Sequence, residues 1–153
     1  FLQTFSKSAP CPDFSRIPVC IEASDSPTLE CLERLARSLS GKVRVLDSRQ
    51  RSFLHLGGVF ACNYVNFMYT VAYDLFREQG IDFSLLAPLM EETLRKAEAN
   101  PPFAVQTGPA ARGDAAVLAR QEALLASSET GRAYLEVYRL LAKAVQERAG
   151  KKI

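Results

Sequence analysis

The chain has 153 residues, a formal net charge of +2 and 48% hydrophobic residues. This length suits one domain, or one domain with part of another, and the hydrophobic fraction is normal for a globular protein. The 19 basic residues are scattered, with no run beyond Lys151-Lys152, so nucleic acid is not indicated as a partner. One histidine and four dispersed cysteines give no metal-ligand spacing, and we expect no bound metal.

The cysteines and the first residues indicate where the protein resides. Cys11, Cys20, Cys31 and Cys62 form no CxxC pair, which suits free thiols in a reducing cytoplasm. The chain begins Phe-Leu-Gln-Thr-Phe, without an initiator methionine or the features of a signal peptide. We therefore expect a cytoplasmic protein in which further sequence precedes this chain.

The first 47 residues predict part of a parallel α/β layer. Residues 1–6 form a short strand or its exit loop, and residues 17–23, IPVCIEA, are typical of a strand buried on both faces. Ser26 before Pro27 predicts the start of a helix, which carries leucines at helical spacing. Residues 42–46, KVRVL, predict a second strand. Two strands make a poor sheet alone, so we expect the rest of this layer upstream.

The longest charge-free stretch runs from Ser52 to Tyr73 and predicts one long buried helix. Its length resembles a membrane span, but His55, Asn63, Asn66 and three tyrosines would need partners in hydrocarbon, so we do not expect a membrane protein. A helix that is apolar on every side must be covered on every side. The shorter helices that follow are thin cover for about 33 Å of helix, so we expect a homodimer.

Residues 48–153 are predicted to be helical apart from their connections. Leucines at helical spacing predict a helix that starts near Asp82 or Ser84 and ends before Asn100. A loop rich in Gly and Pro follows, and Asp114 is placed to cap a helix over residues 115–126. The last helix is predicted over about residues 130–149. The fold class is therefore mostly α, with a helical dimerisation domain behind the α/β segment.

Three polar side chains on the long helix are candidate site residues. On an α-helix with 100° per residue, Asn66 lies about 20° from His55 and Asn63 about 80° from it, so all three can approach one side. A neutral histidine there can exchange a proton near pH 7. The alternative is a structural histidine bonded to a backbone carbonyl. Gly57-Gly58 indicates close approach of another group, or a local break in the helix.

The segment Thr107–Asp114, TGPAARGD, is the second candidate. Backbone amides around Gly108 and Gly113, with the guanidinium of Arg112, could hold a carboxylate or phosphate at the start of the next helix. The alternative is a rigid turn in which Arg112 and Asp114 pair with each other.

Four segments of the chain resemble a known family. They are Gln3-Thr4-Phe5-Ser6, Ile21-Glu22-Ala23, His55 through Asn63, and Thr107-Gly108-Pro109 with Arg112-Gly113-Asp114. Together they resemble a bacterial family of uncharacterised NADP-dependent oxidoreductases, domain-of-unknown-function family number 2520. Its members resemble pyrroline-5-carboxylate reductase and other β-hydroxyacid-dehydrogenase-like enzymes. The resemblance implies that residues 1–47 end a Rossmann-like nucleotide-binding domain, and that residues 48–153 form a helical dimerisation and substrate domain. It also implies NADP as cofactor and an active site between the domains.

The resemblance also implies roles for individual residues. His55 is the candidate proton donor and Asn63 an orienting group. The candidate substrate-binding residues are Gln3, Thr4, Asn66, Arg112 and Asp114. The chain departs from the family at Gln121, where members often have a histidine. Its eight glycines also form no GxGxxG, so we expect the chain alone to bind NADP poorly.

Three functions are consistent with these features. The first is a C-terminal part of an NAD(P)-dependent reductase or dehydrogenase of a small carbonyl, imine or hydroxy acid. The second is a non-catalytic helical dimerisation module, in which the polar residues of the long helix are structural. The third is a small-anion binding domain that uses the turn from Gly108 to Asp114.

Overall fold

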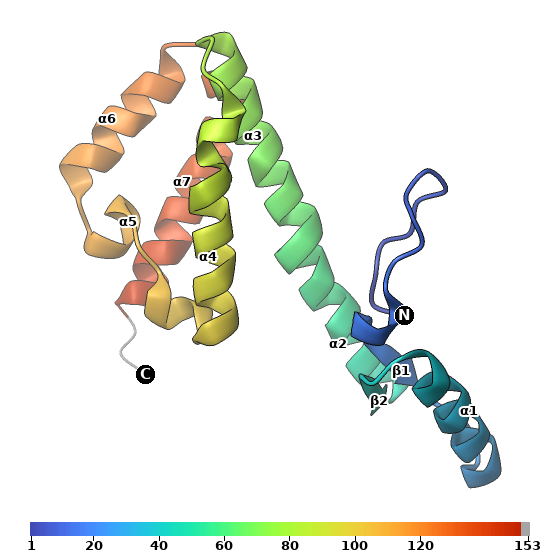
Figure 1. Cartoon of the computed structure of the whole chain (residues 1–153). Coiled ribbons are helices and arrows are strands. Elements are labelled where there is room, and N and C mark those ends of the chain that lie inside the picture. The colour runs from blue at the N-terminus through green and yellow to red at the C-terminus, as the bar shows by residue number, and fades with distance from the viewer. Residues whose placement is uncertain (151–153) are drawn as a thin grey trace. The chain divides into compact units, whose positions relative to one another are not determined.

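The computed structural model describes residues 1–150, whose elements are shown in chain order in Figure 1. The chain divides into two compact units, Phe1–Val65 and a second that begins at Asn66. The predicted boundary between domains, after residue 47, stays a prediction.

The first unit contains the predicted strand, helix and strand. Strand β1 (Val19–Ile21) pairs in parallel with β2 (Val43–Val45), and helix α1 (Ser26–Leu39) connects them. Asp25, rather than Ser26, is the N-cap of α1, because its carboxylate accepts a hydrogen bond from the amide of Thr28 at 2.8 Å. Ser26 and Pro27 therefore occupy the first two helical positions.

The core of the first unit lies between this two-stranded sheet and α1. It consists of Val19, Ile21, Ala36 and Val43, with Leu29 and Leu32 partly buried against them. The buried hydroxyl of Ser40 donates to the carbonyl of Ile17 at 2.6 Å and ties the end of α1 to the start of β1.

Residues 1–6 form a loop and not a strand, which is one of the two conformations predicted for them. The amide of Leu2 donates to the carbonyl of Pro18 at 3.1 Å, which holds this loop beside β1. The rings of Phe1 and Phe5 pack against Phe14, which belongs to the 3₁₀ turn η1 (Phe14–Arg16).

The long charge-free stretch is helical, but it is neither uniform nor buried in the single chain. Helix α2 (Ser48–Gly58), the π-helix η2 (Val59–Tyr64) and α3 (Val65–Glu78) follow one another without a loop. Asp47 and Gln50 form a capping box at its start, four residues before the predicted one. The expectation of burial is wrong for the chain by itself, because Phe53 and Phe60 are 62% and 61% exposed. Within residues 1–150, no helix has the length and hydropathy needed to cross a membrane.

The second unit is helical throughout, which confirms the mostly α fold class. After α3 its elements are η3 (Phe83–Leu86), α4 (Ala87–Ala99), η4 (Pro102–Val105), α5 (Pro109–Arg112), α6 (Ala115–Ala126) and α7 (Glu129–Ala149). Asp114 caps α6, as predicted, and Ser128 caps α7.

Helix α7 packs against α5 and α6, and it also contacts α3. Arg139 on α7 forms an ion pair with Glu122 on α6 at 2.8 Å. The hydroxyl of Tyr134 donates to the carboxylate of Asp74 on α3 at 2.8 Å. Near its N-terminus α7 crosses the end of α6 so closely that only Gly131 fits.

Candidate functional site

A π-helical turn marks the candidate site on the central helix. Asn63 lies inside η2, and His55 lies four residues before it begins, with both side chains exposed in the single chain. π-Helical turns are rare and occur frequently at functional sites. Gly57 and Gly58 immediately precede η2, and a Cβ atom added to either would meet nothing within 4 Å. Of the two interpretations of these glycines, the structure therefore favours a local change in helical geometry over close contact within the chain.

The π-turn changes which polar side chains share a face. It accommodates about one extra residue per turn, so residues beyond it are rotated by roughly 100° relative to an uninterrupted α-helix. Most of this rotation has accumulated at Asn63, which moves from about 80° away from His55 to nearly the same side. The two remain roughly 12 Å apart along the helix axis, so they can share a ligand but not a hydrogen bond. The 20° expected between His55 and Asn66 is wrong, because it assumed an α-helix throughout.

The start of α2 is fixed to the carboxyl end of β1 by Glu22. Its carboxylate accepts hydrogen bonds from the amide of Ser48 at 2.9 Å and the hydroxyl of Ser48 at 2.8 Å, and it also pairs with Arg51. The hydrogen bond from the hydroxyl of Ser48, the one from its amide and the charge of Arg51 lower the pKa of Glu22 below its ordinary value. Partial desolvation of the carboxylate opposes them. In open parallel sheets, ligands bind beyond the carboxyl ends of the strands. Glu22 therefore holds the helix that carries His55 at that end of the sheet.

Gln3 and Thr4 lie elsewhere in the first unit. Gln3 lines a hollow of about 360 Å³ together with Arg16, Pro18 and Lys42, which come before the strands. Its side-chain oxygen accepts a hydrogen bond from the amide of Thr4 at 2.9 Å. Within the described part of the chain, no hydrogen bond joins either residue to His55 or Asn63.

The TGPAARGD segment is an ordered turn in the second unit. Gly108 and Gly113 have φ values of 102° and 69°, which glycine adopts far more readily than other residues. Asp114 accepts a hydrogen bond from the amide of Val117 at 3.1 Å and caps α6, while Arg112 forms no ion pair with it in the described residues. The proposed Arg112–Asp114 pair is thus not formed.

The backbone amides of this turn are largely occupied. The amides of Arg112, Gly113 and Asp114 donate to carbonyls of the same turn. The carboxylate of Asp114 already lies at the N-terminus of α6, where it would repel a second anion. The geometry therefore weakens the small-anion interpretation, although the guanidinium of Arg112 stays exposed.

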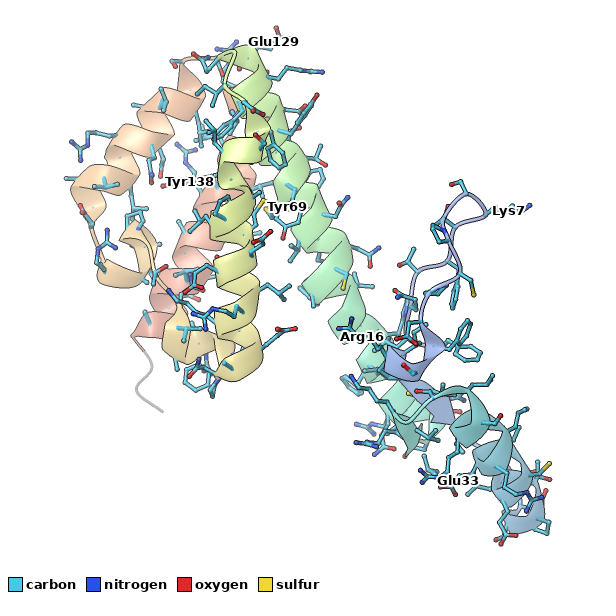
Figure 2. All side chains as sticks on the ribbon, in the orientation of Figure 1. Lys7, Arg16, Glu33, Tyr69, Glu129 and Tyr138 are labelled. Atoms are coloured by element: carbon cyan, nitrogen blue, oxygen red, sulfur yellow. The ribbon has the colours of Figure 1, made fainter. Side chains whose placement is uncertain are left out.

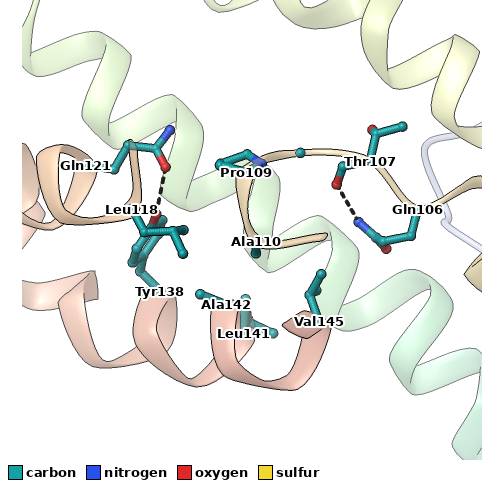
Figure 3. A pocket seen from close by; sticks show the side chains of 11 residues that line it. Gln106, Thr107, Pro109, Ala110, Leu118, Gln121, Tyr138, Leu141, Ala142 and Val145 are labelled. Atoms are coloured by element: carbon teal, nitrogen blue, oxygen red, sulfur yellow. Dashed lines mark hydrogen bonds between the residues drawn. The ribbon is translucent and has the colours of Figure 1, made fainter. Parts of the chain in front are cut away.

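Behind this turn, a pocket of about 300 Å³ opens between the turn, α6 and α7 (Figure 3). At one end the hydroxyl of Tyr138 donates to the side-chain oxygen of Gln121 at 2.7 Å. At the other end the side chain of Gln106 donates to the carbonyl of Thr107 at 3.0 Å. Burial, and then the charge of Glu122, raise the pKa of Tyr138, which keeps its hydroxyl protonated.

Sequence reasoning did not find this pocket or the π-turn. The sequence predicts no site role for Tyr138, and Gln121 differs from the family pattern without indicating a pocket. Nothing in their spacing indicates the hydrogen bond, because they lie 17 residues apart on two helices. The Gly57-Gly58 pair was the one signal of the change in helical geometry.

The family model described as "Domain of unknown function (DUF2520)" matches residues 17–145. The chain belongs to this family. A crystal structure titled "putative NADP oxidoreductase", from Bacteroides fragilis, resembles this DUF2520 chain with a TM-score of 0.85 and 39% sequence identity. The match covers 95% of this chain and 55% of the other, so this DUF2520 chain spans just over half of that protein's length. No curated protein matches it.

Among the described residues of this DUF2520 chain, no group of three or more His, Cys, Asp or Glu side chains could hold a metal ion. The candidate residues fall into two sets. Gln3, Thr4, His55 and Asn63 belong to the first unit, and the second unit contains Asn66, Arg112 and Asp114.

Proposed function

We propose that this chain is the C-terminal part of an NADP-dependent oxidoreductase that acts on a small carbonyl, imine or hydroxy acid. The observation that supports the proposal is the similarity over nearly the whole chain to the Bacteroides fragilis protein. The parallel strand–helix–strand segment fits the end of a dinucleotide-binding layer. Because this chain has no GxGxxG, the cradle for the NADP phosphates belongs to sequence outside it.

In this proposal His55 donates the proton that accompanies hydride transfer to the carbonyl or imine, and Asn63 orients the same substrate. Their placement on nearly one side of the helix supports a shared ligand. The ion-paired Glu22 sets the direction of α2, and so keeps His55 at the carboxyl end of the sheet.

The test is the oxidation of NADPH by the protein from the whole gene with a panel of small ketones, imines and 2-oxo acids. A general acid typically contributes 10² to 10⁴-fold, so we expect His55→Ala to lower kcat by about 100-fold or more. Gln79→Ala, at an exposed position beyond α3, is the control and should leave kcat unchanged. A His55→Ala enzyme with unchanged turnover would favour the non-catalytic alternative.

We also propose that the protein is a homodimer whose interface includes the exposed apolar stripe of α2 and η2. Phe53, Leu56, Phe60 and Tyr64 follow one another at intervals of three and four residues, and each is at least 49% exposed in the single chain. Phe60 and Tyr64 pack edge to face, with their ring centroids 5.2 Å apart. Figure 2 draws the side chains as sticks on the ribbon. Large exposed apolar stripes of this kind mark protein interfaces. Dimerisation does not depend on the oxidoreductase proposal and is tested separately below.

A further inference from the structure

The pocket behind the TGPAARGD turn has the properties of a small-molecule site. Its volume of about 300 Å³ lies at the lower end of the usual range for such sites. Its wall is mostly aliphatic, formed by Leu118, Leu141 and Val145 with smaller side chains between them (Figure 3). All of its lining residues belong to the second unit, between Gln106 and Val145.

The polar groups of the pocket are neutral, and they are held in place. Tyr138 uses its only proton on the oxygen of Gln121, so the side-chain oxygen of Gln121 is occupied and its NH₂ group remains to donate. Within residues 1–150 that NH₂ group has no hydrogen-bond acceptor. The phenol oxygen of Tyr138 can still accept. Gln121 and Tyr138 both line the pocket, so one donor group and one acceptor atom belong to its wall.

Charge selects against an anionic ligand. None of the described residues that line the pocket is charged. Arg139, which follows Tyr138 on α7, already pairs with Glu122 at 2.8 Å and with Glu136 at 2.9 Å. Glu122 is also close enough to act on the phenol of Tyr138. A carboxylate or phosphate in the pocket would lose hydration and meet no cation among the lining residues, which is unfavourable.

We propose that this pocket binds an uncharged small molecule with an aliphatic or alicyclic body and one carbonyl or hydroxyl oxygen. The body packs against Leu118, Leu141 and Val145. The oxygen accepts a hydrogen bond from the NH₂ group of Gln121. The binding does not rest on the proposed function, because neither His55 nor Asn63 lines this pocket.

The test uses two isosteric probes, cyclohexanecarboxamide and cyclohexanecarboxylate, without any nicotinamide cofactor. Binding is followed by NMR of the ¹³C-labelled methyl groups of leucine and valine in the wild-type chain. We expect the amide to shift the methyl resonances of Leu118, Leu141 and Val145 in a saturable way, and the carboxylate to bind about tenfold or more weakly. Equal or tighter binding of the carboxylate would overturn the proposal, as would no saturable shift with the amide up to its solubility limit.

Two variants with the same substitution locate the site. Ala142→Leu fills the pocket from α7, and we expect it to weaken amide binding about tenfold or more. Ala144→Leu places the same side chain on an exposed position of the same helix and should bind like the wild type. If Ala142→Leu does not fold, Gln121→Leu is the second test. It removes the donor and should weaken amide binding. Unchanged binding in the folded pocket variant would show that the amide binds elsewhere and would refute the assignment.

The outcomes separate this inference from the proposed function. If the amide binds in the pocket but the protein from the whole gene does not bind NADPH, the pocket is a ligand site in a protein of another function. If NADPH binds and the amide does not, the oxidoreductase proposal stands and the ligand class is wrong.

Discussion

The close contact between α6 and α7 in the second unit gives a sharp test of its packing. Gly131, at the third position of α7, lies against the end of α6. A Cβ atom built there would be 2.2 Å from the carbonyl oxygen of Leu125 and 2.7 Å from its Cα. Both are backbone atoms and cannot rotate away, so Gly131→Ala forces the two helices apart by about 1 Å.

The magnitude follows from two opposing effects. Overpacking costs about 1–3 kcal/mol and occasionally more, and a contact this short with backbone belongs at the upper end. Alanine is a better helix former than glycine by about 1 kcal/mol, which offsets part of that cost. We therefore expect Gly131→Ala to lower the free energy of unfolding by about 2 kcal/mol. For a unit of fewer than 100 residues, such as the one that begins at Asn66, that corresponds to a drop of roughly 8–16 °C in Tm.

The assay is urea unfolding followed by far-ultraviolet circular dichroism. Gly150→Ala is the matched control, because it makes the same change at the other end of α7, where the nearest atom would be 3.6 Å away and φ is −72°. We expect the control to differ from the wild type by less than about 0.5 kcal/mol. If Gly131→Ala is as stable as this control, the close crossing of α6 and α7 is wrong.

Three further predictions concern the interface, a helix cap and an ion pair. Phe60→Glu should convert a wild-type dimer into a monomer in light scattering, because it places a charge in the apolar stripe. Arg34→Glu on α1 is the control and should leave the mass unchanged. A Phe60→Glu variant that is still a dimer would rule out this interface. Asp114→Ala should destabilise the protein by about 1 kcal/mol in urea unfolding through loss of the α6 cap, whereas Asp114→Asn should cost little, and equal effects of the two would contradict a capping role. Glu22→Gln should be less stable than the wild type at neutral pH. Because hydrogen bonds from Ser48 lower the pKa of Glu22 from 4.5, this difference is fully present above pH 4.5 and disappears as the pH falls through the lowered pKa. A difference in urea midpoint that does not change with pH would show that the carboxylate is not stabilised in the folded state.

Local sequence signals predicted most of the secondary structure. The β-branched runs around Val19 and Val43 form the paired strands, and Asp114 caps the helix that follows it. Such signals act over a few residues and depend on backbone hydrogen bonding, so they can be recognised without knowledge of the fold. The cap of α1 is an exception, because it lies one residue before the predicted Ser26. Asp25 is the cap because its carboxylate reaches the amide of Thr28, three residues on, as a capping side chain does.

The features that sequence did not predict depend on contacts or on small backbone differences. Apolar residues such as Phe60 predicted a covered helix, but a hydrophobic pattern does not say whether the cover comes from the same chain or from another. The π-turn at residues 59–64 differs from an α-helix by one residue per turn, a difference that 3.6-residue periodicity does not register. The Gln121–Tyr138 bond depends on how α6 packs against α7, which Gly131 permits.

The central claim, that this chain is part of an NADP-dependent oxidoreductase, is tested most directly by measuring nicotinamide nucleotide binding calorimetrically. The protein from the whole gene is compared with the 153-residue chain. We predict that the whole protein binds NADPH, at one site per chain, and that the 153-residue chain binds it far more weakly. A whole protein that binds neither NADPH nor NADH would contradict the claim.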